Sequence, residues 1–148
     1  MLLKMMKSQI IAVDFDGTCV IHKYPEIGAK LHGCVKVLKA LQEAGHKVFL
    51  YTMRSYPVKP GDRNTLQEAV DWFTAQGFTL DGINRSPAQF SGSPKQYAAV
   101  YIDDAALGCP LAQYGDEVAV DWFRVAENLV DAGLLTENPL TAGEEVGW

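Results

Sequence analysis

The chain has 148 residues, of which 48% are apolar and 21% charged, a composition typical of one globular domain. Thirteen basic and eighteen acidic residues give a formal net charge of −5, which argues against broad nucleic-acid binding. The longest apolar run, residues 98–102, is too short to span a membrane, and residues 1–10 lack the apolar core of a signal peptide. Cys19, Cys34 and Cys109 are widely spaced, as expected for reduced thiols. We therefore expect a cytoplasmic protein.

The first part of the chain predicts two strands and one helix. Residues 8–15 are β-branched and almost entirely apolar, which predicts a strand buried on both faces. Residues 17–33 are rich in Gly, Pro and short polar side chains and predict a loop or small hairpin, here called the flap. Apolar residues at helical spacing predict a helix over 34–45, ended by Gly45, and the apolar run 46–52 predicts a second strand.

The middle of the chain predicts a second helix and a short strand. Asp62 is expected to cap a helix over 63–77, with Gly77 at its end. Residues 78–84 could hold a short strand, and 85–95 read as a loop.

The last part of the chain predicts two further strands and a final helix. A short helical turn is expected from Lys95, leading into the apolar strand 98–102. Residues 116–123 predict one more strand, and 122–133 predict a helix ended by a glycine. Residues 136–148 have no clear period and are expected to form a loosely held tail.

The alternation of strands and helices predicts the fold class. Strands joined by helices imply parallel pairing with right-handed crossovers. We therefore expect a single α/β domain over residues 1–135, with a doubly wound Rossmann-like parallel sheet sandwiched by helices. Ligands of such sheets bind at the carboxyl ends of the strands.

Polar residues follow several of the predicted strands. They are Asp14, Asp16, Gly17 and Thr18 after the first strand, Thr52 and Arg54 after the second, and Lys95, Asp103 and Asp104 around the late one. Each alone is most simply a turn or surface residue. In a parallel sheet, however, they would converge on one edge, which favours a common site.

These residue types suit phosphoryl transfer. Asp14 and Asp16 are two residues apart in extended chain and point to the same side, so one carboxylate can attack phosphorus while the other protonates the leaving oxygen. Gly17 allows a tight turn that presents N–H groups to an anion, and Thr18 in the same turn is a further candidate for binding phosphate. Thr52 and Lys95 can hold phosphoryl oxygens. Clustered carboxylates are ligands for Mg²⁺ rather than for Zn²⁺.

The segments VDFDGT, Thr52 after VFLY, Lys95 and VYIDD together resemble the four motifs of the haloacid dehalogenase-like (HAD) superfamily. The resemblance runs from about residue 9 to residue 104. It implies that Asp14 is a nucleophile that forms an aspartyl-phosphate and that Asp16 is the general acid, then the base. Thr52 and Lys95 would bind phosphate.

The same resemblance implies a Mg²⁺ site and a mode of substrate access. The family's Mg²⁺ is held by residues that correspond here to Asp14, the backbone carbonyl of Asp16, and Asp103. Asp104 either joins them or caps the following turn. The short flap leaves no room for the family's cap domain, so the chain resembles a small capless hydrolase. Capless members often act on large substrates that supply their own cover, or borrow cover from a second subunit of a homo-oligomer. For this chain we expect a phosphorylated small molecule or a phosphorylated polymer end as the partner.

Three alternatives stay open at the level of sequence. Because Lys95 lies only a few residues before Asp103, Arg54 could replace it as the phosphate-binding cation. A receiver-like module accepts phosphate on aspartate without turnover, but its acid pair follows the first strand rather than a late one. A relative that binds phosphorylated ligands without catalysis would keep the same residues.

Overall fold

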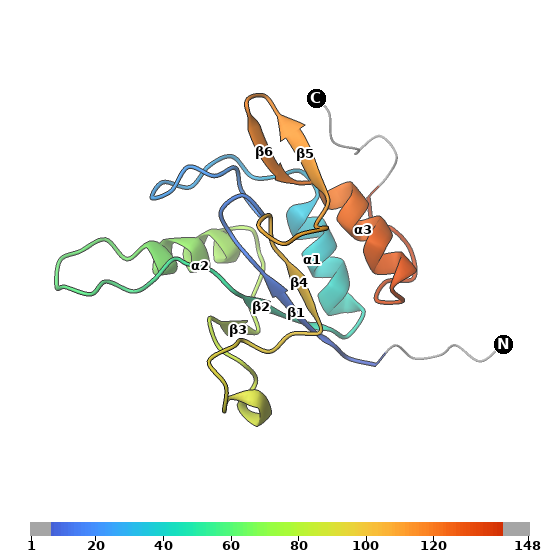
Figure 1. Cartoon of the computed structure of the whole chain (residues 1–148), viewed down its shortest axis with the longest axis horizontal. Helices are drawn as coiled ribbons and strands as arrows, with labels where there is room; N and C mark the ends of the chain where they lie inside the picture. The colour runs from blue at the N-terminus through green and yellow to red at the C-terminus, as the bar shows by residue number, and fades with distance from the viewer. Residues whose placement is uncertain (1–6, 141–148) are drawn as a thin grey trace.

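The computed structural model describes residues 7–140, which form a parallel sheet, three α-helices and a separate β-hairpin (Figure 1). In chain order the elements are β1 (Ile10–Val13), α1 (Cys34–Glu43), β2 (Lys47–Leu50), α2 (Thr65–Ala75), β3 (Gly82–Ile83), the 3₁₀ turn η1 (Ala88–Phe90), β4 (Val100–Ile102), β5 (Leu111–Tyr114), β6 (Glu117–Val120) and α3 (Trp122–Asp131).

The main sheet has four parallel strands in the order β3-β2-β1-β4. Val13 is in register with Leu50 on one side and with Ile102 on the other, so β1, β2 and β4 end at the same edge. The chain adds β2 and β3 on one side of β1 and then returns to place β4 on the other side. This confirms the predicted α/β class with a parallel sheet flanked by helices, and it brings the ends of β1 and β4 together.

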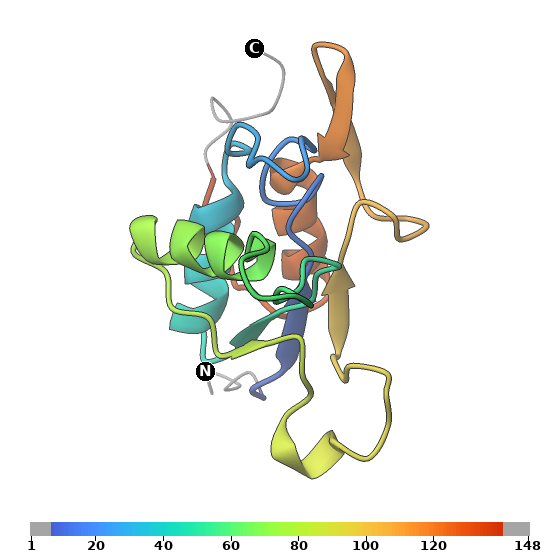
Figure 2. The same cartoon turned by 90° about the vertical axis from the view of Figure 1, so that its left-hand side faces the viewer.

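The three helices pack against one face of this sheet. A single buried cluster joins alternate strand residues, which point to the same face of the sheet, to the inner faces of all three helices. Its strand members are Ile11, Val13, Val48, Leu50 and Ile102, and its helix members include Val37 and Leu41 of α1, Leu66 and Phe73 of α2, and Val125 and Leu129 of α3. Figure 2 shows α1 and α2 on one side of the strands and the segment with η1 below the strands. The structure thus differs from a sandwich with helices on both faces.

The connection between β3 and β4 explains this difference. Residues 84–99 contain Pro87 and Pro94 together with one Gly and three Ser residues, and their only helical piece is η1. A segment of this composition does not form the helix that would cover the second face. The predicted helical turn at Lys95 is also wrong, because Lys95 lies in a bend after η1.

The strand predicted at 116–123 belongs to a hairpin and not to the main sheet. β6 pairs antiparallel with β5, a strand that the sequence analysis missed. Gly115 and Asp116 form the two-residue connection, in which Gly115 has a positive φ of 62°. Figure 1 shows this hairpin projecting beyond the sheet.

The helices end at the predicted glycines, but the residue that caps the start of α2 differs from the predicted one. Gly45 and Gly77 follow α1 and α2 closely with positive φ values, as predicted. Asp62, however, is not the cap of α2. The N-cap of α2 is Asn64, because its side chain accepts a hydrogen bond from the Gln67 N–H at 2.9 Å.

The flap and the residues up to Leu140 pack against the domain. The flap is a small hairpin in which Ile21 N–H donates to the Ala29 carbonyl. The predicted loose tail differs in its first residues: Leu140 is buried, and 141–148 lie outside the described residues. Of the helices between residues 7 and 140, none has the length and apolarity needed to cross a bilayer.

Candidate active site

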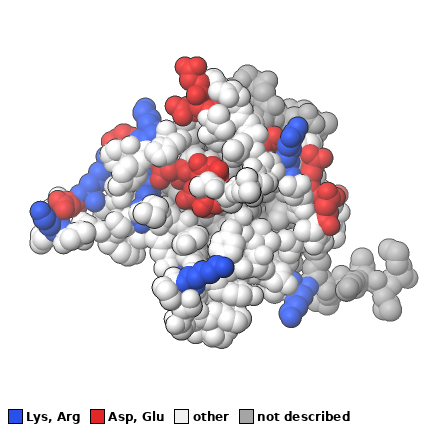
Figure 3. Space-filling view, viewed as in Figure 1, with Lys and Arg blue, Asp and Glu red and all other residues white. Residues whose placement is uncertain are grey.

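Three carboxylates meet where β1 and β4 end. Asp14 directly follows β1, and Asp103 and Asp104 directly follow β4. One carboxylate oxygen from each lies within 4.8 Å of the others. Figure 3 shows acidic side chains gathered near the middle of this face, over the ends of the two strands. The convergence of acids predicted from the sequence is therefore present.

Thr18 links two of these carboxylates. Its hydroxyl lies 3.0 Å from Asp14 Oδ2 and 3.3 Å from Asp104 Oδ1, and it accepts the Asp104 N–H at 3.1 Å. Thr18 is completely buried. The prediction that it binds phosphate is therefore corrected, because the hydroxyl orders the carboxylates from behind.

Gly17 allows the chain to pass close to Asp104. Its φ is 79°, and a Cβ atom at this position would lie 2.4 Å from Asp104 Oδ2. The Gly17 N–H donates to the Val20 carbonyl at 2.8 Å, so it does not present an N–H to an anion as predicted. Glycine is required here by the approach of a carboxylate.

Burial and clustering raise the pKa values of Asp14 and Asp103. Burial, and then the nearby charge of Asp103, raise the pKa of Asp14 to about 8, although the Thr18 hydroxyl partly opposes this shift. The pKa of Asp103 is also raised, first by burial and then by the Asp104 charge. A divalent cation would reverse both effects by stabilising the ionised carboxylates.

Asp16 has a different environment because Arg54 holds it. Arg54 Nε donates to Asp16 Oδ2 at 2.8 Å, and Arg54 Nη2 donates to Asp16 Oδ1 at 2.9 Å. This two-point geometry is the strongest form of a charge-assisted pair. The Asp16 side chain retains 13% exposure, whereas that of Arg54 has none.

Arg54 is fixed from several directions. Its guanidinium also donates to the carbonyls of Thr65 and Glu26, at 3.2 and 2.9 Å. It lies 5.1 Å from the Phe15 ring centroid and 5.2 Å from that of Tyr24. The structure therefore does not favour Arg54 as the phosphate-binding cation, because four of its five N–H groups donate to Asp16, Thr65 and Glu26.

Thr52 lies at the end of β2 and lines the same cavity as the acids. Its hydroxyl accepts the Arg54 N–H at 3.1 Å, and its N–H donates to Asn84 Oδ1 at 2.8 Å. Asn84 Nδ2 also donates to the Arg54 carbonyl at 3.3 Å. Asn84 was missed in the sequence, although it follows a strand. Its φ of 48° is tolerated by Asn better than by most residues.

Lys95 is separate from this group. It lies on the connection between β3 and β4, with Nζ 5.8 Å from the Tyr101 ring centroid. It lines a neighbouring cavity and is not among the residues that line the acidic one. The structure does not bring it to the carboxylates in this conformation.

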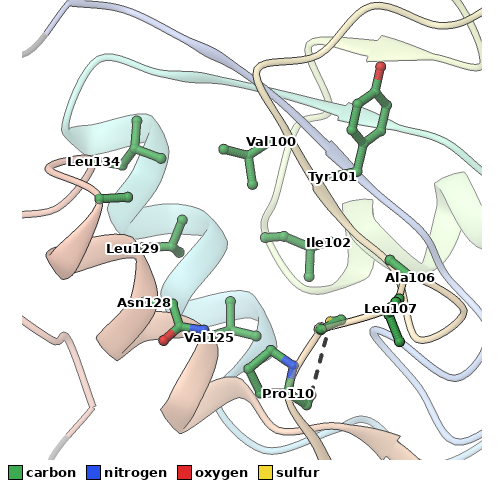
Figure 4. A pocket seen from close by; sticks show the side chains of 13 residues that line it. Val100, Tyr101, Ile102, Ala106, Leu107, Pro110, Val125, Asn128, Leu129 and Leu134 are labelled. Atoms are coloured by element: carbon green, nitrogen blue, oxygen red, sulfur yellow. Dashed lines mark hydrogen bonds between the residues drawn. The ribbon is translucent and has the colours of Figure 1, made fainter.

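The acidic site opens into a cavity of about 490 Å³. The flap contributes His22 and Tyr24 to its wall, and the loop after β2 contributes Met53, which is 97% exposed. A second cavity, of about 300 Å³, lies between β4 and α3 (Figure 4). The acidic cavity is the better candidate for an active site, because carboxylates with raised pKa values converge in it.

The donor set fits a hard divalent cation. Asp14, Asp103 and Asp104 offer carboxylate oxygens only, which Mg²⁺ prefers. Among residues 7–140, no ion pair uses any of these three side chains. Their mutual repulsion is therefore not relieved by a Lys or Arg.

Comparison with known proteins identifies a structural neighbour. No protein-family model and no curated protein match the chain. Among solved structures, a conserved protein from Bacteroides thetaiotaomicron is 29% identical and superposes with a TM-score of 0.65. The match covers 93% of this chain and 97% of that one, so the two share a fold over nearly their whole length.

Proposed function

We propose that this protein is a Mg²⁺-dependent phosphomonoester hydrolase that works through an aspartyl-phosphate on Asp14. The observation that carries the proposal is the meeting of Asp14, Asp103 and Asp104 at the ends of two adjacent parallel strands, next to Thr52. The resemblance to capless members of the HAD superfamily supports it, as does the open cavity over the acids. Phosphorylated small molecules and polymer ends are the substrate classes that this cavity favours.

The reaction divides into two displacements. An Asp14 carboxylate oxygen attacks phosphorus, the P–O bond to the leaving group breaks, and the leaving oxygen takes up a proton. Water then attacks the phosphoryl group on Asp14, loses a proton, and releases inorganic phosphate with the carboxylate restored. Mg²⁺ held by Asp14, Asp103 and Asp104 would keep the acids ionised and neutralise phosphoryl charge. The Thr52 hydroxyl lines the cavity, where it can donate to a phosphoryl oxygen.

Asp16 is the proposed proton donor and acceptor, as the family resemblance implies. In the structure both of its oxygens accept hydrogen bonds from Arg54. Asp16 can therefore take up and give a proton only when one of these bonds is released, which makes Arg54 a positioning residue. The partial exposure of Asp16 on the cavity side leaves it accessible to a leaving group.

A binding protein without turnover is the alternative, and one kinetic assay separates the two. Wild-type protein should release phosphate from 4-nitrophenyl phosphate over many turnovers, with Mg²⁺ required. Asp14→Asn should lose at least about a thousandfold in kcat while keeping the circular dichroism spectrum of the wild type. Asp116→Asn, on the exposed hairpin turn, is the matched control and should keep full activity. Stoichiometric phosphate uptake without turnover would contradict the proposal.

A further inference from the structure

The face of the sheet that lacks helices carries aromatic rings beside the candidate active site. Phe49 and Tyr101 are in register with Ala12, so their side chains share the face opposite to the helices. Figure 4 shows Tyr101 pointing away from α3, whereas Val100 and Ile102 point toward it. Because side chains alternate, Tyr51 lies on the Tyr101 face too, one residue beyond the Val13–Leu50 pair and therefore level with Asp14.

The rings of Tyr51 and Tyr101 meet across β1. Their centroids are 6.2 Å apart, although the two strands that carry them are separated by β1. Ala12 is the residue between them, and its small side chain leaves room for the rings. The two tyrosines therefore form a surface that begins beside the proposed nucleophile.

The connection between β3 and β4 extends this surface. Phe90 and Tyr97 stack with their centroids 4.0 Å apart and an interplanar angle of 21°. With Tyr101 and Lys95 they line a cavity of about 430 Å³. We call the rings of Tyr51, Phe90, Tyr97 and Tyr101 the aromatic shelf.

The shelf is fixed in place but open to solvent. The Tyr101 hydroxyl donates to the Gln96 carbonyl, and the buried Gln96 amide donates to the Leu50 carbonyl at 3.4 Å. These bonds tie the connection to the strands. Tyr51, Phe90 and Tyr97 nevertheless remain 41%, 43% and 36% exposed.

The chemistry of the shelf selects a planar, anionic ligand. Exposed aromatic rings that are held in place stack well on flat π-systems such as a nucleobase. Lys95 supplies one cation at the shelf, and Figure 3 shows that the surface below the acidic patch is otherwise mostly uncharged. Tyr101 lies two residues before Asp103, or about 7 Å along the strand. This spacing suits a ligand in which one ribose separates a base from a phosphate.

We propose that the aromatic shelf binds the base of a nucleoside monophosphate whose phosphate enters the acidic cavity. The inference rests on the proposed phosphatase function and names its substrate class. Because the Tyr51 and Tyr101 rings are tilted by 57° to each other, the base stacks on Tyr101 and meets Tyr51 at its edge. Lys95 contacts the base or the ribose hydroxyls from the rim.

The test compares adenosine 5′-monophosphate with ribose 5-phosphate in the presence of Mg²⁺. Both substrates release a primary alcohol, and they differ at ribose C1, where the nucleotide carries its base and the sugar phosphate a hydroxyl. The expected kcat/KM for adenosine 5′-monophosphate is at least about tenfold higher. Tyr101→Leu should bring the ratio of the two values close to one, whereas Tyr101→Phe, which keeps the ring, should preserve it. Tyr56→Leu, at an exposed position outside both cavities, should also preserve it.

The outcomes separate the inference from the proposed function. Equal kcat/KM values for the two substrates in the wild type would overturn the aromatic shelf as a base site and leave the phosphatase proposal standing. If neither substrate is hydrolysed, calorimetric titration compares the affinities of the protein for adenosine 5′-monophosphate and ribose 5-phosphate. Tighter binding of the nucleotide, lost in Tyr101→Leu, supports the base site even in a protein without turnover. No preference in binding overturns it. A preference unchanged in Tyr101→Leu also overturns it.

Discussion

Arg54 donates two parallel hydrogen bonds to Asp16, from Nε to Oδ2 at 2.8 Å and from Nη2 to Oδ1 at 2.9 Å. The pair connects the loop after β2 to the loop after β1, and its guanidinium is fully buried. Because a buried charge is costly without its partner, the Arg54–Asp16 pair fixes the geometry of both loops.

Removing Arg54 should destabilise the fold strongly. Arg54→Met keeps an apolar stem but leaves Asp16 without its partner. We expect the free energy of unfolding, measured by urea denaturation, to fall by about 3–5 kcal/mol. Arg63→Met is the matched control, because Arg63 also makes a double ion pair but is exposed to solvent. Its effect should be much smaller. Equal effects of the two substitutions would show that the buried pair has no special role.

Loss of the Thr18 hydroxyl should disturb the acidic site from behind. Thr18→Val conserves volume but removes the donor shared by Asp14 and Asp104 and the acceptor of the Asp104 N–H. We expect a loss of about 1–3 kcal/mol in the free energy of unfolding and a further rise in the pKa of Asp14, since this hydroxyl lowers it. The pH dependence of the melting temperature in EDTA, where no metal ion offsets the shift, measures the second effect. Thr18→Ser, which retains the hydroxyl, should leave that profile in place, and a shift of equal size in both variants would argue against the shared donor.

Asn84 should be needed for activity more than for stability. Asn84→Gly tolerates the positive φ but releases the Thr52 N–H and the Arg54 carbonyl, so kcat should fall about tenfold as Thr52 loses its position. Asn84→Asp keeps an acceptor for the Thr52 N–H and should retain most of the activity. Steady-state kinetics with 4-nitrophenyl phosphate measures both. A glycine variant with wild-type kcat would remove Asn84 from the site.

The acids should make stability depend on pH and on Mg²⁺. In the folded protein the pKa of Asp14 is about 8, against about 3.9 in an unfolded chain. The folded state therefore holds the extra proton between these values, and stability without divalent ions falls as pH rises from about 4 to about 8. Mg²⁺ should restore the melting temperature, and more strongly at pH 8 than at pH 5.

Thermal melts in EDTA and in Mg²⁺ measure this effect. Asp14→Asn should flatten the pH dependence in EDTA and weaken the response to Mg²⁺. A melting temperature of the wild type that rises steadily from pH 5 to pH 8 in EDTA would contradict the environment assigned to Asp14.

The sequence was sufficient to predict the elements that local pattern determines. Buried strands such as 10–13 are nearly continuous apolar runs, and α1 carries its buried residues at helical spacing with Gly45 after it. The acids of the site were found because a parallel sheet brings strand ends together, and Asp14 and Asp103 each follow a strand directly.

What the sequence could not predict depends on contacts between distant segments. Nothing local shows that Arg54 pairs with Asp16, 38 residues away, or that Thr18 faces inward. The second face of the sheet lacks a helix because residues 84–99 form a loop, so the expected double layer was wrong there. β5 was missed because its four residues alternate weakly and pair only with β6.

The central claim is that Asp14 carries the phosphoryl group during turnover. The most direct measurement is mass spectrometry of protein quenched in acid while it hydrolyses 4-nitrophenyl phosphate with Mg²⁺, followed by peptide mapping. We expect one phosphoryl group on the peptide that contains Asp14, at that residue, and none without Mg²⁺ or in Asp14→Asn. Continued phosphate release by Asp14→Asn, or a phosphoryl group on another residue in the wild type, would contradict the account.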